Sequence, residues 1–343
     1  MTWRDLLLQV IDYVIVFDKV CVIVTVVVLI LSIYFIHRVI ACRRIHVNFK
    51  LVLCCTAISF LIFPVFRRLI DLLYLLTEGI TNRLYINVIC VGLSVVNVAS
   101  CVSSTTCMVM LALEQHLAAR FVRTYEERSM SIGVTLTCFT LFYSIAISIG
   151  INAFHLHNFD FYRSTDNCHP VNYNWGYAML FYSASLGMCT FACWWLMKVR
   201  EFNTRQRRAQ FTTLSTRYQQ HENENAAISI TATVVGYMAY SVIGVVGSLL
   251  RMCFYDLFGD HSKGDTVFVG LGYLIAELYA LFHMACFMKY NRGMRKMVKL
   301  DFLRLFGVRI MKRTSVVVGP ALPTITLTDE ADEYFRQLQS SWK

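Results

Sequence analysis

One carboxylate lies inside a long stretch that is otherwise free of charge. Glu277 interrupts residues 266–288, which contain no other Asp, Glu, Lys or Arg. Placing a carboxylate at the depth of a bilayer is costly, so such residues usually face a helix bundle or a wet cavity. Tyr273 and Leu281 share its face of a helix. Two interpretations remain open: a residue of a ligand pocket or of coupling, or a hydrogen bond to Ser or Asn on a neighbouring helix.

The other residues that could do chemistry do not form a reactive cluster. An intramembrane enzyme needs histidines and carboxylates at one depth, and His283 has no such neighbours in the sequence. His155, His157 and His169 could bind a metal in principle, but their spacing does not recur as a ligand set. Residues 266–288 contain no lysine, which excludes a retinal Schiff base. We therefore expect no enzymatic activity, no metal and no cofactor.

Seven weakly charged stretches must position these residues, and they predict a membrane protein. A helix crosses the hydrocarbon with roughly 17–25 mostly apolar residues. The chain is 57% hydrophobic and 16% charged, with only 16 Gly and 4 Pro, which favours helices. The expected fold is all-α, a seven-transmembrane-helix bundle over residues 20–288. Its helices are predicted at about 20–41, 48–66, 84–113, 131–152, 175–198, 225–250 and 266–288.

The placement of the basic residues predicts the orientation. Most of the 32 Lys and Arg residues fall in alternate connections and in the C-terminal tail, and cytoplasmic loops carry such an excess. The N-terminal residues 1–19 are therefore expected outside and the C-terminus inside. Because the cations flank helices rather than alternate with aromatic residues, a nucleic-acid partner is not expected. They can set topology and hold anionic lipid, and they can also receive an intracellular partner.

Two of the 13 cysteines are candidates for a disulfide on the oxidising side. Cys90 lies near the outer end of the third stretch, and Cys168 lies in the connection after the fourth. A disulfide between them would tether that connection over the mouth of the bundle. Free thiols are the alternative, and Cys253, which is also outward, is the main rival partner.

The third stretch carries small and polar residues on one helical face. Small residues let membrane helices approach closely, and Ser or Asn can hydrogen-bond across the contact. We therefore expect this helix to be central and most of the stripe to serve packing, with Asn97 as a candidate ligand contact. The stripe consists of Cys90, Ser94, Asn97, Cys101, Ser104, Met108, Ala112 and Gln115.

Motifs at the inner ends of two helices carry a family resemblance. Glu114, Gln115 and His116 resemble the Asp/Glu-Arg-Tyr triplet of G-protein-coupled receptors, and the 25-residue step from Cys90 to Gln115 is similar to rhodopsin-like spacing. The Ala-Arg-x-x-x-x-Tyr-Glu sequence that contains Arg120 and ends at residue 126 resembles nematode serpentine chemoreceptors of the Sra superfamily. The sequence LSTRYQQHEN at 214–223 also resembles their signature. Among these families the chain most resembles the Sre family, whose pattern covers about residues 20–313.

The chain also departs from the receptor pattern. Gln115 stands where the triplet has arginine, and the Trp-x-Pro and Asn-Pro-x-x-Tyr motifs are missing, so the usual lock between helices three and six cannot be transferred. We hypothesise that Glu114 pairs with Arg217 in the resting state, or that Arg120 and Arg123 pair with Glu222 and Glu224; solvated charges at helix ends are the alternative. The residues assigned to this inner switch are Glu114, Gln115, His116, Arg120, Arg123, Arg217, Tyr218 and Glu222.

The resemblance implies a chemosensory receptor. A small-molecule ligand would bind in the outer half of the bundle, and a heterotrimeric G protein would bind inside, with the protein in the plasma membrane, as in the ciliary membrane of sensory neurons. A transporter or channel is the alternative, but it would more naturally show repeated halves, broken helices and several intramembrane charges. Residues 289–313 are predicted to form a basic amphipathic helix on the inner leaflet. The polar tail, 314–343, is predicted to be disordered.

Overall fold

A computed structural model describes residues 15–42, 45–77, 80, 83–121, 125, 130–157, 161–162, 168, 170, 174–209, 214–258 and 263–305. These residues form helices joined by short connections, and they include no strand. For the helical residues 15–19, 206–209, 214–222, 258 and 263–266 the backbone alone is described. The predictions for residues 1–14, for Arg123 and for the tail at 314–343 lie outside the described residues.

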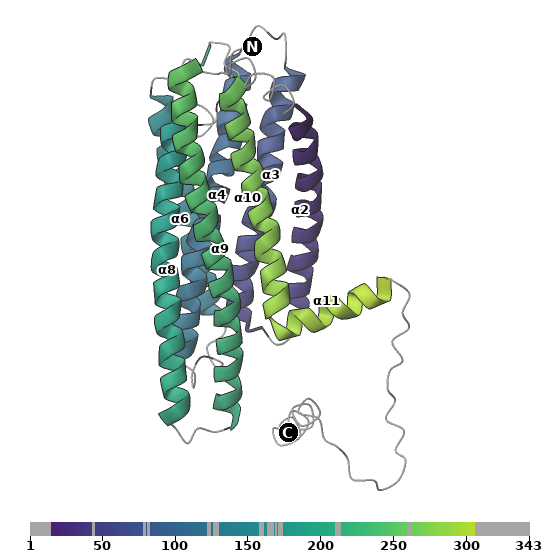
Figure 1. The fold of residues 1–343 in the computed structure, drawn as a ribbon, viewed down its shortest axis with the longest axis vertical. Helices are drawn as coiled ribbons and strands as arrows, with labels where there is room; N and C mark the ends of the chain where they lie inside the picture. Colours follow the sequence, from purple (N-terminus) through teal and green to yellow (C-terminus); the bar gives the residue numbers. More distant parts are fainter. Residues whose placement is uncertain are drawn as a thin grey trace. The chain divides into compact units, whose positions relative to one another are not determined.

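The helices from α2 to α10 follow one another along the chain and run up and down a single bundle (Figure 1). Seven of them are long and apolar enough to cross a membrane, which confirms the predicted all-α, seven-helix fold. They are α2 (Ile15–Ala41), α3 (Val47–Leu76), α4 (Leu84–Arg120), α6 (Ser131–Leu156), α8 (Trp175–Ala209), α9 (Leu214–Phe258) and α10 (Lys263–Tyr290), and α11 (Arg292–Leu305) follows.

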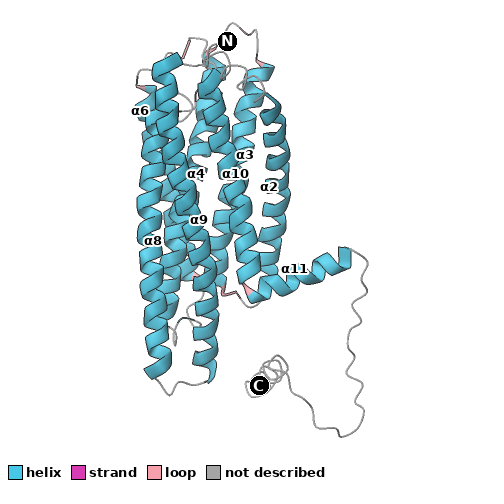
Figure 2. Ribbon diagram, in the orientation of Figure 1, coloured by secondary structure: helices cyan, strands magenta, loops and turns pink. Residues whose placement is uncertain are grey.

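The bundle is built of long helices (Figure 2), and several of them extend well past the uncharged stretches from which they were predicted. α3 continues for ten residues beyond the predicted end at residue 66, through Arg67, Arg68 and Asp71. α9 has 45 residues, which at 1.5 Å per residue is about 68 Å, against roughly 30 Å of hydrocarbon. Charged residues mark where a helix leaves the hydrocarbon, but they do not end the helix. Its backbone hydrogen bonds join residues four positions apart, so they form outside the hydrocarbon as well.

α4 lies at the centre of the bundle, as its polar stripe predicted. It contacts α3, α6, α8 and α9, and its buried residues run from Ile86 to Ala119. α2 and α10 close the other side, since α10 contacts α9, α2 and α3. Residues up to Lys299 form one compact unit, which contains all seven spanning helices.

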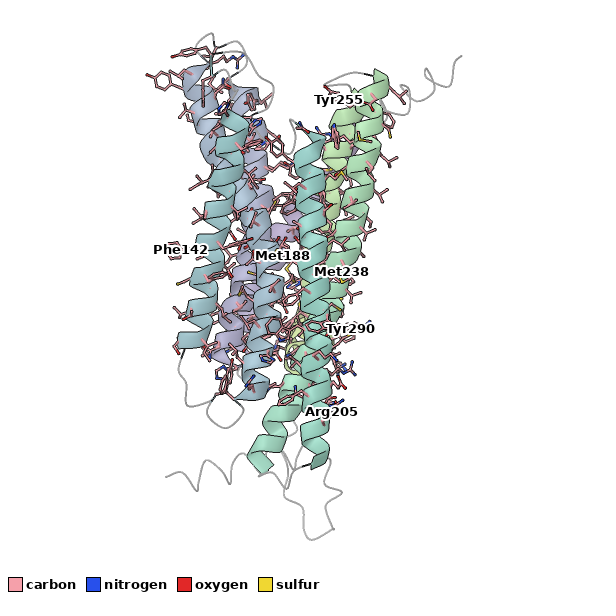
Figure 3. The ribbon with its side chains drawn as sticks, turned by 90° about the vertical axis from the view of Figure 1, so that its left-hand side faces the viewer. Phe142, Met188, Arg205, Met238, Tyr255 and Tyr290 are labelled. Carbon is pink, nitrogen blue, oxygen red and sulfur yellow. A yellow bond between two sulfur atoms is a disulfide. The ribbon has the colours of Figure 1, made fainter. Side chains whose placement is uncertain are left out.

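The outer surface of this unit is apolar. Ile30 of α2 is 62% exposed, and Phe142 of α6, which points away from the bundle in Figure 3, is 76% exposed. Exposing so large an apolar surface to water would be unfavourable, whereas the hydrocarbon of a bilayer accommodates it.

Hydrogen bonds join α4 to its neighbours α3 and α6. The Ser94 hydroxyl lies 3.0 Å from Asn152 Oδ1 of α6, and Ser59 of α3 lies 2.8 Å from Ser103. The Ser148 hydroxyl of α6 donates to the Val95 carbonyl oxygen at 2.6 Å. Of the stripe residues, Ser94 thus joins α4 to α6, which is the kind of packing role expected from the small and polar side chains of the stripe.

Candidate functional site

A disulfide marks one end of the bundle. Cys90, near the start of α4, is bonded to Cys168, and their Cα atoms are 6.1 Å apart. Both cysteines are fully buried and pack with Ile70 of α3. Cys253, the rival partner in the sequence analysis, is an exposed free thiol. We call the end that carries this bond the disulfide end, and the other end of the bundle the opposite end.

The disulfide half of the bundle contains a cavity of about 830 Å³. Six helices line it, and most of the lining side chains are apolar or aromatic. Met188 of α8, labelled in Figure 3, is on the cavity wall. The wall includes Phe63 of α3; Val98, Cys101, Val102 and Thr105 of α4; Ile147, Gly150 and Phe154 of α6; Leu180, Tyr182 and Ser185 of α8; Tyr240, Gly247 and Arg251 of α9; and Phe268 and Tyr273 of α10.

Of the three residues predicted to contact a ligand, only Tyr273 lines this cavity. Its ring stacks on Phe63 with centroids 5.4 Å apart, and the Arg67 guanidinium carbon lies 3.8 Å from the ring centroid. These contacts fix the tyrosine ring between α3 and α10. A cation over a tyrosine face is a favourable arrangement, worth about 0.5–2 kcal/mol depending on exposure.

Asn97 and Glu277 make contacts between helices instead. The Asn97 amide donates to the Phe63 carbonyl oxygen at 2.7 Å, next to Pro64 in α3. The Glu277 carboxylate is 1% exposed, and the Thr25 hydroxyl of α2 lies 3.0 Å from both of its oxygens. The structure thus gives Glu277 a hydrogen bond to a neighbouring helix, with Thr in place of the expected Ser or Asn.

The floor of the cavity is a network of tyrosines that the sequence analysis missed. The Tyr237 hydroxyl of α9 lies 2.7 Å from the Thr105 hydroxyl and 3.2 Å from that of Ser104, both in α4. Thr105 also lies 3.1 Å from Ser185 of α8. The Tyr237 ring contacts Tyr279 of α10 edge-on, with centroids 4.8 Å apart. Four helices therefore meet through these side chains.

A sequence signal for this network exists. Tyr237 and Tyr240 are three residues apart, so they share a face of a helix, and Ser104 belongs to the polar stripe. Tyrosine hydroxyls buried in a membrane bundle need hydrogen-bond partners. The partner helix could not be chosen from this pattern alone, because each of the other six helices offers Ser or Thr residues.

At the opposite end, Glu114 is buried at 1% exposure and holds the connection after α4. The Tyr125 hydroxyl donates to one of its carboxylate oxygens, and the Gln115 amide donates to the other at 2.8 Å. The Tyr125 ring packs against His46, just before α3, with centroids 4.5 Å apart. Burial, together with the charge of Glu114, raises the pKa of Tyr125, so its hydroxyl stays protonated and keeps donating.

The structure brings together only part of the predicted inner switch. Glu114 and Gln115 are in contact, whereas His116 packs edge-on against Trp195 of α8, and Arg120 is exposed. The side chains of Arg217, Tyr218 and Glu222 lie outside the described residues, as does all of Arg123. The described partners of the Glu114 carboxylate are a hydroxyl and an amide, not a cation.

Residues 8–302 match the family model described as serpentine type 7TM GPCR receptor, class ab chemoreceptor. The chain belongs to this family. The match covers all seven spanning helices, and together they point to a non-enzymatic receptor that spans the membrane several times. It supports the predicted resemblance to Sra-superfamily chemoreceptors, but the matched class is ab, so the finer assignment to Sre gains no support. A search of curated proteins finds no match.

Proposed function

We propose that this receptor binds an apolar small molecule in the cavity of the disulfide half and signals to a heterotrimeric G protein from the opposite end. The cavity is the observation on which this proposal rests. Its volume of about 830 Å³ lies within the roughly 300–1,000 Å³ range of small-molecule sites. It has the expected mixture of an apolar wall and a few polar groups, such as Thr105 and Ser185.

The chemistry of the two ends supports the proposed orientation. A disulfide persists on the oxidising side of a membrane, which supports placing the Cys90–Cys168 bond outside the cell. The opposite end carries basic residues on the described ends of α8 and α10, including Lys198, Arg200 and Lys289. Such residues favour the cytoplasmic side. Membership of a chemoreceptor family favours the plasma membrane of a sensory neuron, including its cilium, as the site of action.

α9 supplies a physical connection between the cavity and the opposite end. Tyr240 lines the cavity, Tyr237 lies in the network below it, and α9 continues without a break to Leu214. A ligand that pushes on Tyr240 or Tyr182 changes the packing of the whole tyrosine network, because their rings are in contact at 5.5 Å. A shift of α9 would then reach the surface that meets the G protein.

We expect Tyr237→Phe to weaken the response to agonist. The variant keeps the ring but removes the hydroxyl that joins α9 to Thr105 and Ser104. Losing about 1 kcal/mol of hydrogen bonding changes an equilibrium between two receptor states by roughly fivefold. The measurement is a concentration–response curve at matched surface expression. Tyr255→Phe, an exposed tyrosine on the same helix, is the control, and equal curves for both variants would rule out the role of Tyr237.

We expect Tyr125→Phe to raise basal signalling severalfold. Without its hydroxyl, the buried Glu114 carboxylate keeps a single donor, and an under-satisfied buried charge costs about 1–3 kcal/mol or more. States in which the end of α4 moves and Glu114 reaches water then become more populated. Ligand-free cAMP or calcium signalling, normalised to surface receptor, measures the effect. Tyr290→Phe, an exposed tyrosine at the same end, should leave it unchanged; unaltered basal signalling in Tyr125→Phe would refute the restraint.

The receptor proposal itself is tested in cells that express the full chain. The cells are challenged with a panel of apolar small molecules while calcium or cAMP is recorded, with and without inactivation of their G proteins. A response that requires both the G protein and an open cavity supports the proposal. Gly247→Leu fills the cavity, because no atom lies within 4 Å of a Cβ added at Gly247. Conductance through purified protein in liposomes, without a G protein, would support the channel alternative instead.

A further inference from the structure

The cavity opens sideways between α6 and α8. Two of its lining residues, Phe154 of α6 and Leu180 of α8, are 75% and 67% exposed. A side chain on a cavity wall keeps so large an exposed fraction only where the wall reaches the outer surface. Within the described residues, α6 packs mainly against α4 and α3, and α8 packs mainly against α9 and α4. α6 and α8 have few backbone contacts with each other, and the rings of Phe154 and His155 of α6 meet Tyr177 of α8 near the disulfide end. The opening therefore lies on the side of these rings that is farther from the disulfide end. Figure 3 shows α6, which carries Phe142, and α8, which carries Met188, standing apart on this side.

This opening lies at the depth of the membrane. The lining residues of α6 fall within the spanning segment Ser131–Leu156, and those of α8 fall within Trp175–Arg205. Ile147, Ala184 and Met188 lie well inside these segments, at least nine residues from the nearer end at the disulfide side. The opening therefore faces the acyl chains of the bilayer and not only the water above it.

Small residues form the edges of the opening. On α6 they are Ala146 and Gly150, one helical turn apart, and on α8 Ala184 is exposed at the wall. No atom lies within 4 Å of a Cβ added at Gly150. A larger side chain at this position would occupy the opening without meeting packed atoms.

The chemistry of the wall selects an uncharged occupant. Arg251 is the one charged residue among the lining residues that the structure describes, and it lies near the disulfide end of α9. The hydroxyls deeper in the wall, Thr105 and Ser185, already bond to each other and, through Thr105, to Tyr237. An anion or cation that entered between α6 and α8 would lose its hydration without gaining an ion-pair or hydrogen-bond partner in the opening.

We propose that the ligand of this receptor is an uncharged, lipid-soluble molecule that enters the cavity from the bilayer, between α6 and α8. The inference rests on the proposed function and adds the class and the route of the ligand. An apolar molecule dissolves in the membrane first, which raises its concentration beside the opening. It then moves from hydrocarbon into an apolar wall, so entry requires no step through water.

Photolabelling of the full-length receptor in liposomes tests the route without any G protein. The probe is a long-chain alcohol with a diazirine in its chain, dissolved in the lipid, and labelled peptides are mapped by mass spectrometry. We expect labelling at residues 143–154 and 177–188 that an excess of the unlabelled alcohol removes. Gly150→Phe and Ala184→Phe should each reduce it severalfold, whereas Gly187→Phe should not, because Gly187 has equally open surroundings but is not on the wall.

The outcomes separate this inference from the proposed function. Equal labelling in wild type and both opening variants, each verified as folded by gel filtration, would overturn the route. Labelling by a diazirine phospholipid that the alcohol does not displace would also overturn it, because the cavity would then hold a structural lipid. Specific alcohol labelling in a receptor that never activates a G protein would keep the cavity and the route, and it would count against the proposed signalling.

Discussion

Replacing Gly133 by alanine should remove most of the folded receptor from the cell surface. Gly133 is near the start of α6, where a Cβ would lie 2.6 Å from the Asn48 Cα atom and 2.8 Å from the Asn48 carbonyl oxygen of α3. Both are backbone atoms, so no rotamer change relieves the overlap and the two helices must separate. The separation also stretches the 3.0 Å hydrogen bond from the Gly133 amide to the Asn48 side chain. Such overpacking costs about 1–3 kcal/mol.

The consequences of Gly133→Ala reach the candidate signalling end. Asn48 follows His46, whose ring packs on Tyr125, so the displaced helix start disturbs the group that holds Glu114. A loss of 1–2 kcal/mol can change cellular abundance severalfold. Surface labelling and the melting temperature of the detergent-solubilised receptor measure the loss. Gly92→Ala is the matched control, since its added methyl meets no atom within 4 Å, and equal abundance for both variants would refute the close approach.

Removing the disulfide should be similarly damaging. In the double variant Cys90→Ser and Cys168→Ser, the unfolded chain loses a cross-link between residues 78 positions apart. Closing a loop of that length corresponds to roughly 4.5 kcal/mol in the chain-entropy account, and measured values are commonly about 2–4 kcal/mol. The buried site beside Ile70 also loses sulfur packing, because both cysteines have no exposed surface. We expect a lower melting temperature and weaker ligand responses.

The decisive measurement compares the wild type with and without a reducing agent. Reduction should lower the melting temperature of the wild type and leave that of the double variant unchanged. Cys253→Ser is the control, because Cys253 is an exposed free thiol in the same half of the bundle, and it should melt and respond to reduction like the wild type. A Cys253 variant that loses the response to reduction would show that the other pairing forms instead.

The opposite end of the bundle shows how much a sequence motif predicts by itself. The triplet pointed to Glu114, which is buried and hydrogen-bonded in the structure, and the missing arginine showed that the usual lock could not be assumed. The nearest charged motif, at Arg217, then suggested an ion pair between helices. The structure gives Glu114 a tyrosine from its own following connection, 11 residues away. A hydroxyl satisfies a buried carboxylate without bringing a second charge out of water.

The sequence by itself determined the number of helices and their membrane character. In hydrocarbon, the backbone of a spanning segment can form its hydrogen bonds only within the protein. A helix meets this requirement locally, so each span is visible in the sequence as a run of about 20 apolar residues. The polar stripe of α4 likewise predicted a central helix, because small and polar side chains on one face have to be covered by protein. These properties depend only on residues close together in the chain.

Only the tertiary structure decided the partners, because they depend on the rotation and depth of each helix. Thr25 and Glu277 are 252 residues apart, and Tyr237 and Thr105 are 132 apart. Lipid tails are as apolar as the helix surfaces, so hydrophobicity does not say which face of a helix turns inward or toward which neighbour. The cavity and its opening between α6 and α8 arise from the same cause: away from the ring contacts near the disulfide end, the apolar faces of these two helices make few contacts with each other.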